Sequence, residues 1–140
     1  MYSMRVKSVM ERAKRLVAPP QTTVAKAAKL MAKKNVGAVM VVEDKLLVGI
    51  FTERDLVVRV IAQGRDVATT RIGEVMTPDP ISVDPDEIFG RALLLMYDNG
   101  FRHVPVVRDG EPLGIVSSRS ALDPDMEEFV SETQRRLSLR

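Results

Sequence analysis

The 140-residue sequence contains no cysteine and no tryptophan, and it has only one histidine, four phenylalanines and two tyrosines. Without cysteine, disulfides, thiolate nucleophiles and cysteine-ligated metal or iron–sulfur sites are excluded, and a single histidine excludes a histidine-rich metal centre. So few aromatic rings offer little surface on which single-stranded bases could stack. RNA recognition is therefore disfavoured, and no metal cofactor is predicted.

A strong charge of one sign and a long apolar run are also missing. The chain carries 21 Lys and Arg against 19 Asp and Glu, so its formal charge of +2 does not indicate a dedicated nucleic-acid binder. No apolar stretch reaches the ~20 residues of a membrane span, and the N-terminus is charged where a signal peptide needs an apolar core. We expect a soluble, cytoplasmic protein without membrane partners, and 45% hydrophobic residues are enough to form a core.

The basic residues that are present gather at the N-terminus. Residues 1–15 hold five basic side chains and one acidic one, a local charge of five minus one, or +4. Two interpretations are open: a solvated helical arm, or a segment that contacts an acidic partner. The residues are Arg5, Lys7, Arg12, Lys14 and Arg15, with Glu11 as the acid.

An internal repeat organises most of the chain. Residues 20–56 align without a gap on residues 85–121 at an offset of 65, with identical residues at 11 of the 37 aligned positions. Upstream, "SVM" at 8–10 resembles "EVM" at 74–76. The sequence therefore predicts an N-terminal helix and first unit in residues 1–70, a second unit in 71–123, and a C-terminal helix in 124–140.

Each unit shows the same order of periodicities. An apolar stripe at Val24, Ala27, Ala28 and Met31 predicts a helix from Thr22 or Thr23 to about Asn35. Short β-branched runs then predict hairpins, and a helix follows each hairpin. The pattern is strand, helix, strand, strand, helix, which indicates an α/β fold with Met31 and Met96 in the core. The other predicted elements are a helix at 86–99 that Gly100 ends, strands at 38–42, 47–51, 103–107 and 112–116, and a helix at 53–63.

The junction "GIFTERDL" at 49–56 has two compatible interpretations. Thr52 and Asp55 are spaced as a helix cap and its reciprocal partner. A helix N-terminus with a hydroxyl also suits a phosphate, and a carboxylate beside it could accept two hydrogen bonds from a ribose diol. Gly49, inside an apolar strand, indicates close approach by another group. The motif recurs in the second unit at Gly114, Ser117 and Arg119.

The doubled unit, the "VM" that opens each copy, the "HVPVV" strand and "GIFTERDL" together resemble a tandem pair of cystathionine-β-synthase (CBS) domains, a Bateman module, over about residues 6–122. The resemblance implies two β-α-β-β-α repeats packed with pseudo-two-fold symmetry, plus terminal helices. It also implies a regulatory or energy-sensing module that binds an adenosyl nucleotide between the repeats, foremost AMP or ATP, with ADP and S-adenosylmethionine as alternatives. Such pairs form flat homodimers and signal through an effector protein, which the sequence does not identify.

Carried onto this sequence, the resemblance implies one main cleft and a weaker sister cleft. In the main cleft Asp55 would accept the ribose hydroxyls, Thr52 would face phosphate or ribose, and Ile50 would flank the adenine. Its opposite wall would consist of Ile81, Ser82, Val83, Val104 and Pro105, with Arg102 and His103 facing phosphate. The sister cleft would consist of Val17, Ala18, Gly37, Ala38, Met40, Ile115, Ser117 and Ser120.

The sister cleft departs from the family pattern, so one ligand per chain is expected. Ser120 stands where the family often has aspartate, and Gly37 and Ala38 stand where the main cleft has Arg102 and His103. A lone histidine in a strand is also compatible with a purely structural role, so the role of His103 stays open.

Enzymatic activity is not predicted, because no nucleophile, base and oxyanion donors come together in the sequence. The acidic residues at 125–129 are more simply the start of the terminal helix. A ligand-independent structural or interaction protein that dimerises and has vestigial clefts remains the alternative function. In either case the helices after the hairpins are expected to meet across a two-fold axis, through Leu56, Val57, Val60 and Ile61 in the first copy.

Overall fold

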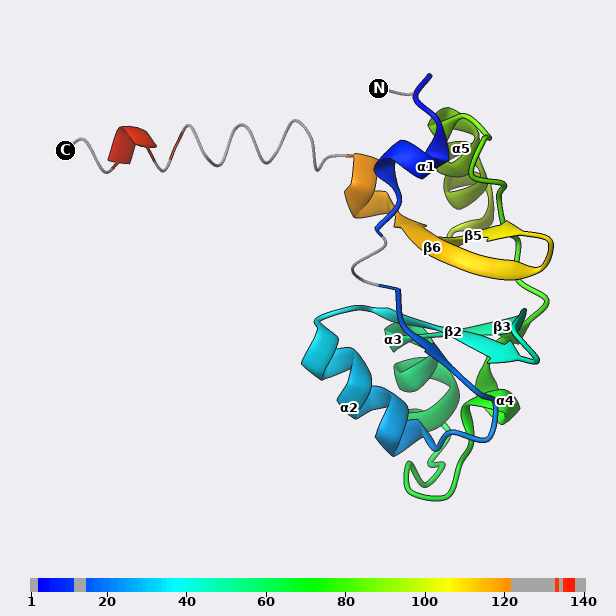
Figure 1. Cartoon of the computed structure of the whole chain (residues 1–140). Coiled ribbons are helices and arrows are strands. Elements are labelled where there is room, and N and C mark those ends of the chain that lie inside the picture. Colours follow the sequence, from blue (N-terminus) through cyan, green and yellow to red (C-terminus); the bar gives the residue numbers. More distant parts are fainter. Residues whose placement is uncertain (1–2, 12–14, 122–132, 134, 138–140) are drawn as a thin grey trace.

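The computed structural model describes residues 3–11, 15–121, 133 and 135–137. Two small sheets lie next to each other in the middle of the molecule, and the helices cover their outer sides (Figure 1). The first sheet has the order β1-β2-β3-β4, with β1 parallel to β2 and the other pairs antiparallel, and the second consists of antiparallel β5 and β6. The α/β fold of two tandem repeats is thereby confirmed. In chain order the elements are α1 (Val6–Val9), β1 (Val17–Ala18), α2 (Val24–Lys34), β2 (Ala38–Glu43), β3 (Leu46–Thr52), α3 (Glu53–Asp55), η1 (Leu56–Ile61), α4 (Ile72–Val75), β4 (Thr77–Pro78), α5 (Phe89–Asn99), β5 (His103–Arg108), β6 (Glu111–Ser117) and η2 (Ser118–Ala121).

Helix α2 begins and ends where the sequence predicts. The Thr23 hydroxyl accepts a hydrogen bond from the amide of Lys26 at 3.2 Å, which caps the first turn. Asn35 ends the helix in the left-handed conformation, with φ of 55°. The predicted stripe lies in the core, where Met31 is buried, and its counterpart Met96 is buried at the matching position of α5.

Helix α5 begins at Phe89, three residues later than the sequence predicts. The preceding backbone is occupied by the N-terminal segment, because the amide of Val6 donates to the carbonyl of Glu87 at 2.8 Å and the amide of Phe89 donates to the carbonyl of Met4 at 2.7 Å. A contact between residues more than 80 positions apart therefore sets the start of this helix.

The helix predicted at 53–63 changes type after one turn. Its first turn is α-helical, but residues Leu56–Ile61 form a π-helix, in which the amide of Ala62 donates to the carbonyl of Val57. Four of the six π-helical residues are β-branched, and such residues have a slightly lowered propensity for the regular α-helix. Val60 is fully buried in the first core, so the expectation that it forms part of a dimer face is wrong, whereas Val57 and Ile61 are each 59% exposed.

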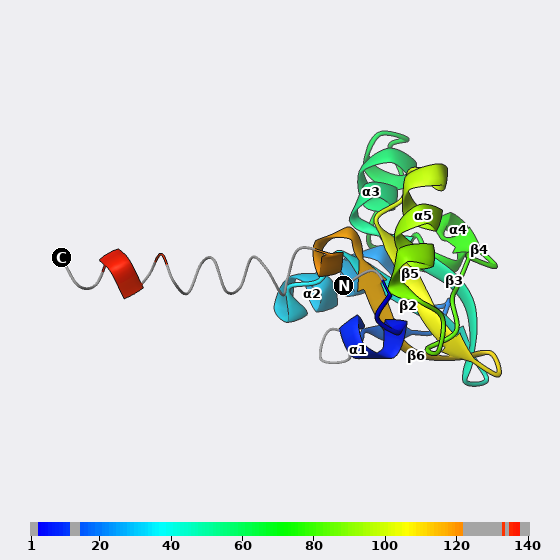
Figure 2. The same cartoon turned by 90° about the horizontal axis from the view of Figure 1, so that it is seen from above.

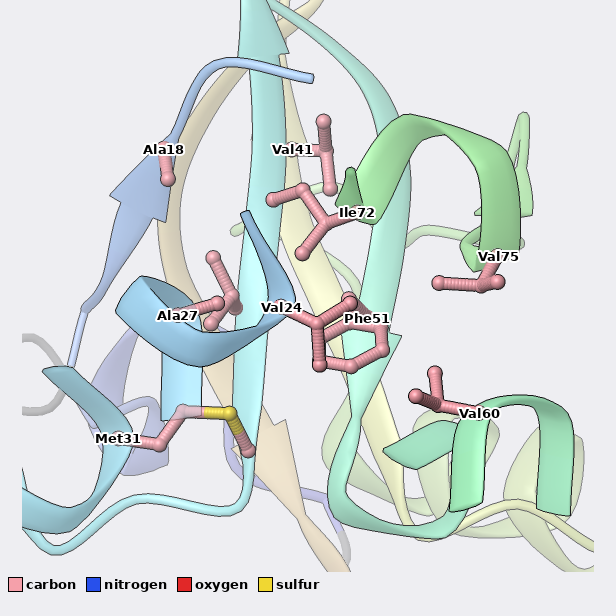
Figure 3. Packing of buried hydrophobic residues seen from close by; sticks show 10 residues of the cluster. Ala18, Val24, Ala27, Met31, Val41, Phe51, Val60, Ile72 and Val75 are labelled. Carbon is pink, nitrogen blue, oxygen red and sulfur yellow. The ribbon is translucent and has the colours of Figure 1, made fainter. Parts of the chain in front are cut away.

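The segment that opens the second repeat packs on the first repeat. Ile72 and Val75 of α4 are buried in the first core beside Phe51 (Figure 3). Strand β4, which follows, pairs with β3 opposite Gly49. A Cβ atom on Gly49 would lie 2.2 Å from the Sδ atom of Met76. The group that approaches this glycine is therefore a methionine side chain of the other repeat.

The segment that opens the first repeat packs reciprocally on the second. Val6 of α1 is fully buried in the second core, next to α5 (Figure 2). Glu11 pairs with Ile115 of β6, and a Cβ atom on Gly114 would lie 3.2 Å from the Sδ atom of Met10. Each repeat therefore supplies one edge segment to the sheet of the other.

The interpretation of the basic N-terminus as a solvated helical arm is consequently wrong for residues 5–11. Only four residues are helical, and the acidic partner of the segment is Asp86 of the second repeat. Lys7 Nζ lies 3.0 Å from Asp86 Oδ1, and Arg5 donates to the Asp86 carbonyl at 2.7 Å. Lys7 beside Asp86 also holds the pKa of that carboxyl below its usual range. Arg12 and Lys14, like most of the predicted helix at 124–140, lie outside the described residues.

The contact between Gly49 and Met76 predicts a measurable cost for a single methyl group. Gly49→Ala should lower the free energy of unfolding by about 1–3 kcal/mol because the methionine must move. Gly114→Ala should cost less, since Met10 leaves more room there. Urea unfolding of both variants measures the difference. In a Met76→Ala background, Gly49→Ala should lower the free energy of unfolding by less than it does in the parent protein. An equal loss in both backgrounds would contradict this packing.

Candidate functional site

Thr52 and Asp55 form the predicted capping box at the start of α3. The Asp55 Oδ2 atom accepts from the Thr52 amide at 2.9 Å and from the Thr52 hydroxyl at 3.1 Å, and the Asp55 amide donates back to the hydroxyl oxygen at 3.3 Å. The other carboxylate oxygen lies 3.5 Å from Nε of Arg59. The capping interpretation is confirmed. The binding of ribose by the same carboxylate stays a prediction.

Ile50 and Ile115, which the sequence assigns to separate clefts, lie in one apolar seam. Both are buried, together with Ala38, in a small cluster separate from the two main cores. Ile50 comes from β3 and Ile115 from β6, so this cluster is where the sheets of the two repeats touch. The seam lies between the two places where the sequence predicts ligands.

The predicted walls of the two clefts are assembled from matching strand pairs. The Val83 amide donates to the Pro105 carbonyl at 3.0 Å, and Val83 and Val104 are buried, whereas Ile81 and Ser82 are exposed. In the first repeat, Val17 lies opposite Met40 and Ala18 lies opposite Val41. These residues lie at equivalent positions of the two repeats.

A cavity of about 510 Å³ opens between the repeats. One wall comes from the loop before β2 and from the start of α3, and the other comes from the loop before β5, from β6 and from η2. Its volume is in the range of small-ligand sites. The lining residues are Glu11, Asn35, Val36, Gly37, Ala38, Glu53, Arg102, His103, Ile115, Ser117, Ser118 and Arg119.

The cavity groups the predicted residues differently from the sequence interpretation. Arg102 and His103 line it together with sister-cleft residues, namely Gly37, Ala38, Ile115 and Ser117, whereas Ile50, Thr52 and Asp55 are not among the lining residues. His103 lies opposite Ser117 in the β5–β6 register, and the missing side chain of Gly37 leaves space in front of the His103 ring. The basic pair is therefore not confined to the side of Asp55. Ser120 belongs to η2, and its side chain lies outside the described part.

Three charged residues of the cavity were not assigned to a site from the sequence. Arg119 adds a second arginine to the wall of Arg102, and Glu53 and Glu11 supply carboxylates. The recurrence of the arginine in "TERD" and "SSRS" was the available signal for Arg119. The wall with Arg102, His103 and Arg119 is suited to an anion, whereas Glu53 and Glu11 add negative charge to the same cavity. Within the ranges that the structure describes, no group of three His, Asp or Glu side chains could hold a metal ion.

Burial lowers the pKa of His103 below its ordinary value of 6.5. The neighbouring charges of Arg102 and Arg119 also lower the pKa, whereas the carboxylate of Glu53 opposes the shift. The imidazole is therefore largely neutral at pH 7. An anion bound beside it would favour the protonated ring.

This shift predicts a pH dependence of stability. The unfolded chain takes up a proton on His103 near pH 6.5, above the pKa of the folded protein, so the free energy of unfolding should fall as the pH drops from about 7 towards 5. His103→Gln should remove this contribution, while all other titrations remain common to both proteins. Urea unfolding at several pH values compares the two. Parallel pH curves for both proteins would contradict the prediction.

The sequence matches the family model of the CBS domain twice, over residues 6–62 and 72–125. It is 41% identical over 118 residues to the mitochondrial CBS domain-containing protein CBSX3 of Arabidopsis thaliana, and the alignment covers 81% of this chain and 57% of that protein. It is 40% identical over 98 residues to CBS domain-containing protein YhcV of Bacillus subtilis, covering 70% of this chain and 69% of the relative. It spans only 16% of another relative, the Meiotically up-regulated gene 70 protein of Schizosaccharomyces pombe.

Solved structures with the same fold include complexes with adenosyl compounds. A CBS domain protein from Pyrobaculum aerophilum complexed with AMP is 27% identical, with a TM-score of 0.77 over 84% of this chain and 89% of that one. The CBS domain pair of protein MJ0100, in complex with 5′-methylthioadenosine and S-adenosyl-L-methionine, is 28% identical, with a TM-score of 0.77 over 84% and 96%. A hexameric CBS-CP12 protein from bloom-forming cyanobacteria is 28% identical, with a TM-score of 0.79 over 87% and 68%.

Proposed function

Because this chain belongs to the CBS domain family, we propose that it is a regulatory module that binds an adenosyl nucleotide between its two repeats and acts through a partner protein. The observation that carries the proposal is the cavity of about 510 Å³ at this position, with Arg102, His103 and Arg119 in its wall. Structures of related pairs contain AMP, 5′-methylthioadenosine or S-adenosyl-L-methionine, which supports an adenosyl ligand.

In this proposal the phosphate group of AMP or ATP is held beside Arg102 and His103. Two oxygens of a phosphate can accept hydrogen bonds from a guanidinium, and an N–H of the histidine ring can donate a further hydrogen bond. The ribose would extend from the cavity past Glu53, which lines it, to Thr52 and Asp55, which do not. Asp55 Oδ2 accepts the hydrogen bonds of Thr52, and Oδ1, which lies 3.5 Å from Nε of Arg59, would accept from a ribose hydroxyl.

A ligand-independent interaction protein is the second candidate function, because one edge of the molecule exposes an apolar face. This edge patch combines η1 of the first repeat with α5 of the second, and Tyr97 within it is 86% exposed. Isolated exposed apolar residues are common, but five on one helix of each repeat favour an interface. The members of the edge patch are Val57, Val58, Ile61, Leu94 and Tyr97.

We propose that a second copy of the chain covers the edge patch, with or without nucleotide. The cytoplasmic location, the absence of nucleic-acid and membrane partners, and signalling through an effector protein stay predictions. In the described ranges, none of the helices has the length and apolar character that a membrane span requires.

Titration calorimetry with AMP and adenosine tests the nucleotide proposal. The parent protein should bind AMP more tightly than adenosine, and added salt should narrow the difference because the phosphate contact is electrostatic. Asp55→Asn keeps an acceptor for the cap but loses the charge. The variant should therefore bind both AMP and adenosine with about ten- to a hundredfold lower affinity. Arg102→Ala should weaken AMP and leave adenosine unchanged.

Arg54→Ala is the matched control, because Arg54 is an exposed arginine on the same turn as Asp55 and does not line the cavity. It should bind both ligands as the parent does. Ser117→Ala tests the other side of the cavity. If that variant loses affinity while Asp55→Asn does not, or if each chain binds two equivalent ligands, the ribose lies in the sister cleft. Absence of binding by any adenosyl compound would favour the interaction protein.

Size exclusion with light scattering tests the dimer. The parent should have twice the chain mass of 15.6 kDa at micromolar concentration. Val57→Glu/Ile61→Glu should give the monomer mass, because association would bury charges without partners. Leu46→Glu changes a comparably exposed apolar residue outside the edge patch and should remain dimeric. A monomeric parent, with and without AMP, would refute this proposal.

A further inference from the structure

Arg59 connects the Asp55 carboxylate to the opening segment of the second repeat. On one side, its Nε atom lies 3.5 Å from Asp55 Oδ1. On the other side, its Nη1 atom donates to the carbonyl oxygens of Val75 at 3.2 Å and Met76 at 3.0 Å. The planar guanidinium has several donors in fixed directions, so one side chain can hold both groups at once.

The two carbonyls belong to the segment on which the first core depends. Val75 is buried beside Phe51, and Met76 fills the space above Gly49. They lie at the C-terminal end of α4, where carbonyl groups have no partner within the helix and a cation is favoured. Arg59 therefore holds α4 and the start of β4 on the first repeat.

The π-helical turn after Asp55 supplies this arginine. Arg59 lies in η1, four residues after Asp55, and single π-helical turns occur frequently at functional sites. The side chain of Asp55 contacts Thr52 and Arg59, and Arg59 in turn contacts the carbonyls at the end of α4, so Arg59 connects the two.

We propose that Arg59 is a positioning residue that fixes the Asp55 carboxylate and couples it to α4. A nucleotide ribose that engages Asp55 then changes how firmly α4 is held on the first repeat. This last step rests on the proposed nucleotide binding, whereas the coupling between Asp55 and α4 does not. The coupling would connect nucleotide binding at Asp55 to a second cavity of about 320 Å³, which Arg59, Arg65 and Glu74 line.

Hydrogen exchange tests the coupling without any ligand. The amides to follow are those of Glu74 and Met76, which are hydrogen-bonded within the α4 segment. Arg59→Gln and Asp55→Asn should each speed their exchange by about tenfold, through loss of a charged contact that opposes local opening. The double variant should be no faster than Arg59→Gln alone, because both changes interrupt one connection.

The control for this experiment is Arg54→Gln, which should leave α4 unchanged, and the amides of α2 report any general loss of stability. Unchanged exchange of Glu74 and Met76 in Asp55→Asn would overturn the coupling. Equal acceleration in α2 and α4 would also overturn it, since the effect would then be a general loss of stability.

Discrimination of the ribose diol tests the positioning role. The parent should bind AMP about tenfold more tightly than 2′,3′-dideoxy-AMP, because only AMP offers both hydroxyls to Asp55. Arg59→Gln should reduce this preference to below about threefold, while Arg54→Gln retains it. If Arg59 had only a structural role, Arg59→Gln would lower the affinities for AMP and 2′,3′-dideoxy-AMP by the same factor, and their ratio would not change.

The outcomes separate the two proposals. If no adenosyl nucleotide binds the parent, the proposed function fails, and the exchange experiment still decides the coupling. If AMP binds and the diol preference survives Arg59→Gln, the positioning role is wrong. If AMP binds without changing the exchange of Glu74 and Met76, the nucleotide is not coupled to α4.

Discussion

The packing of a methionine from each repeat on a glycine of the other is the contact on which the rest of the structure depends. Met76 occupies the space above Gly49, and Met10 occupies the space above Gly114. Met76 could not lie there if Gly49 carried a side chain, whereas a side chain at Gly114 would require only a small shift of Met10. The exchange gives each core residues of both sequence repeats, so the two units cannot separate without exposing apolar surface of both.

This exchange also sets the position of the cavity between the repeats. Where the two sheets meet, Ile50 and Ile115 form a narrow apolar seam. Loops and the first turns of helices border the space beside this seam. The backbone there is symmetric: the Glu53 amide donates to the Gly37 carbonyl, and the Ser118 amide donates to the Arg102 carbonyl. The side chains are not symmetric, because Gly37 occupies the position in the first repeat that Arg102 occupies in the second. The described cavity therefore has Arg102 and His103 on one wall, and Gly37 with the Glu53 carboxylate on the other.

Asp55 combines a structural role with the ligand-binding role that we propose for it. Its contacts with Thr52 satisfy the first turn of α3, and its contact with Arg59 brings a cation to the same carboxylate. A carboxylate held by such contacts keeps one orientation, which is what a hydrogen-bond acceptor for a diol needs. Helix capping and the proposed ligand binding are therefore compatible at this position.

The sequence by itself determined the features that depend on neighbouring residues: the repeat, both hairpins, helix α2 with its Thr23 cap, and the Thr52–Asp55 capping box. These follow from periodicity and from hydrogen bonds that span three or four positions. Only the tertiary structure decided which repeat Met10 and Met76 pack on, where α5 begins, and which residues share a cavity with Arg102 and His103. Those outcomes depend on contacts between residues far apart in the chain, and a pattern repeated twice in sequence is equally compatible with each unit closing on itself or exchanging a segment with the other.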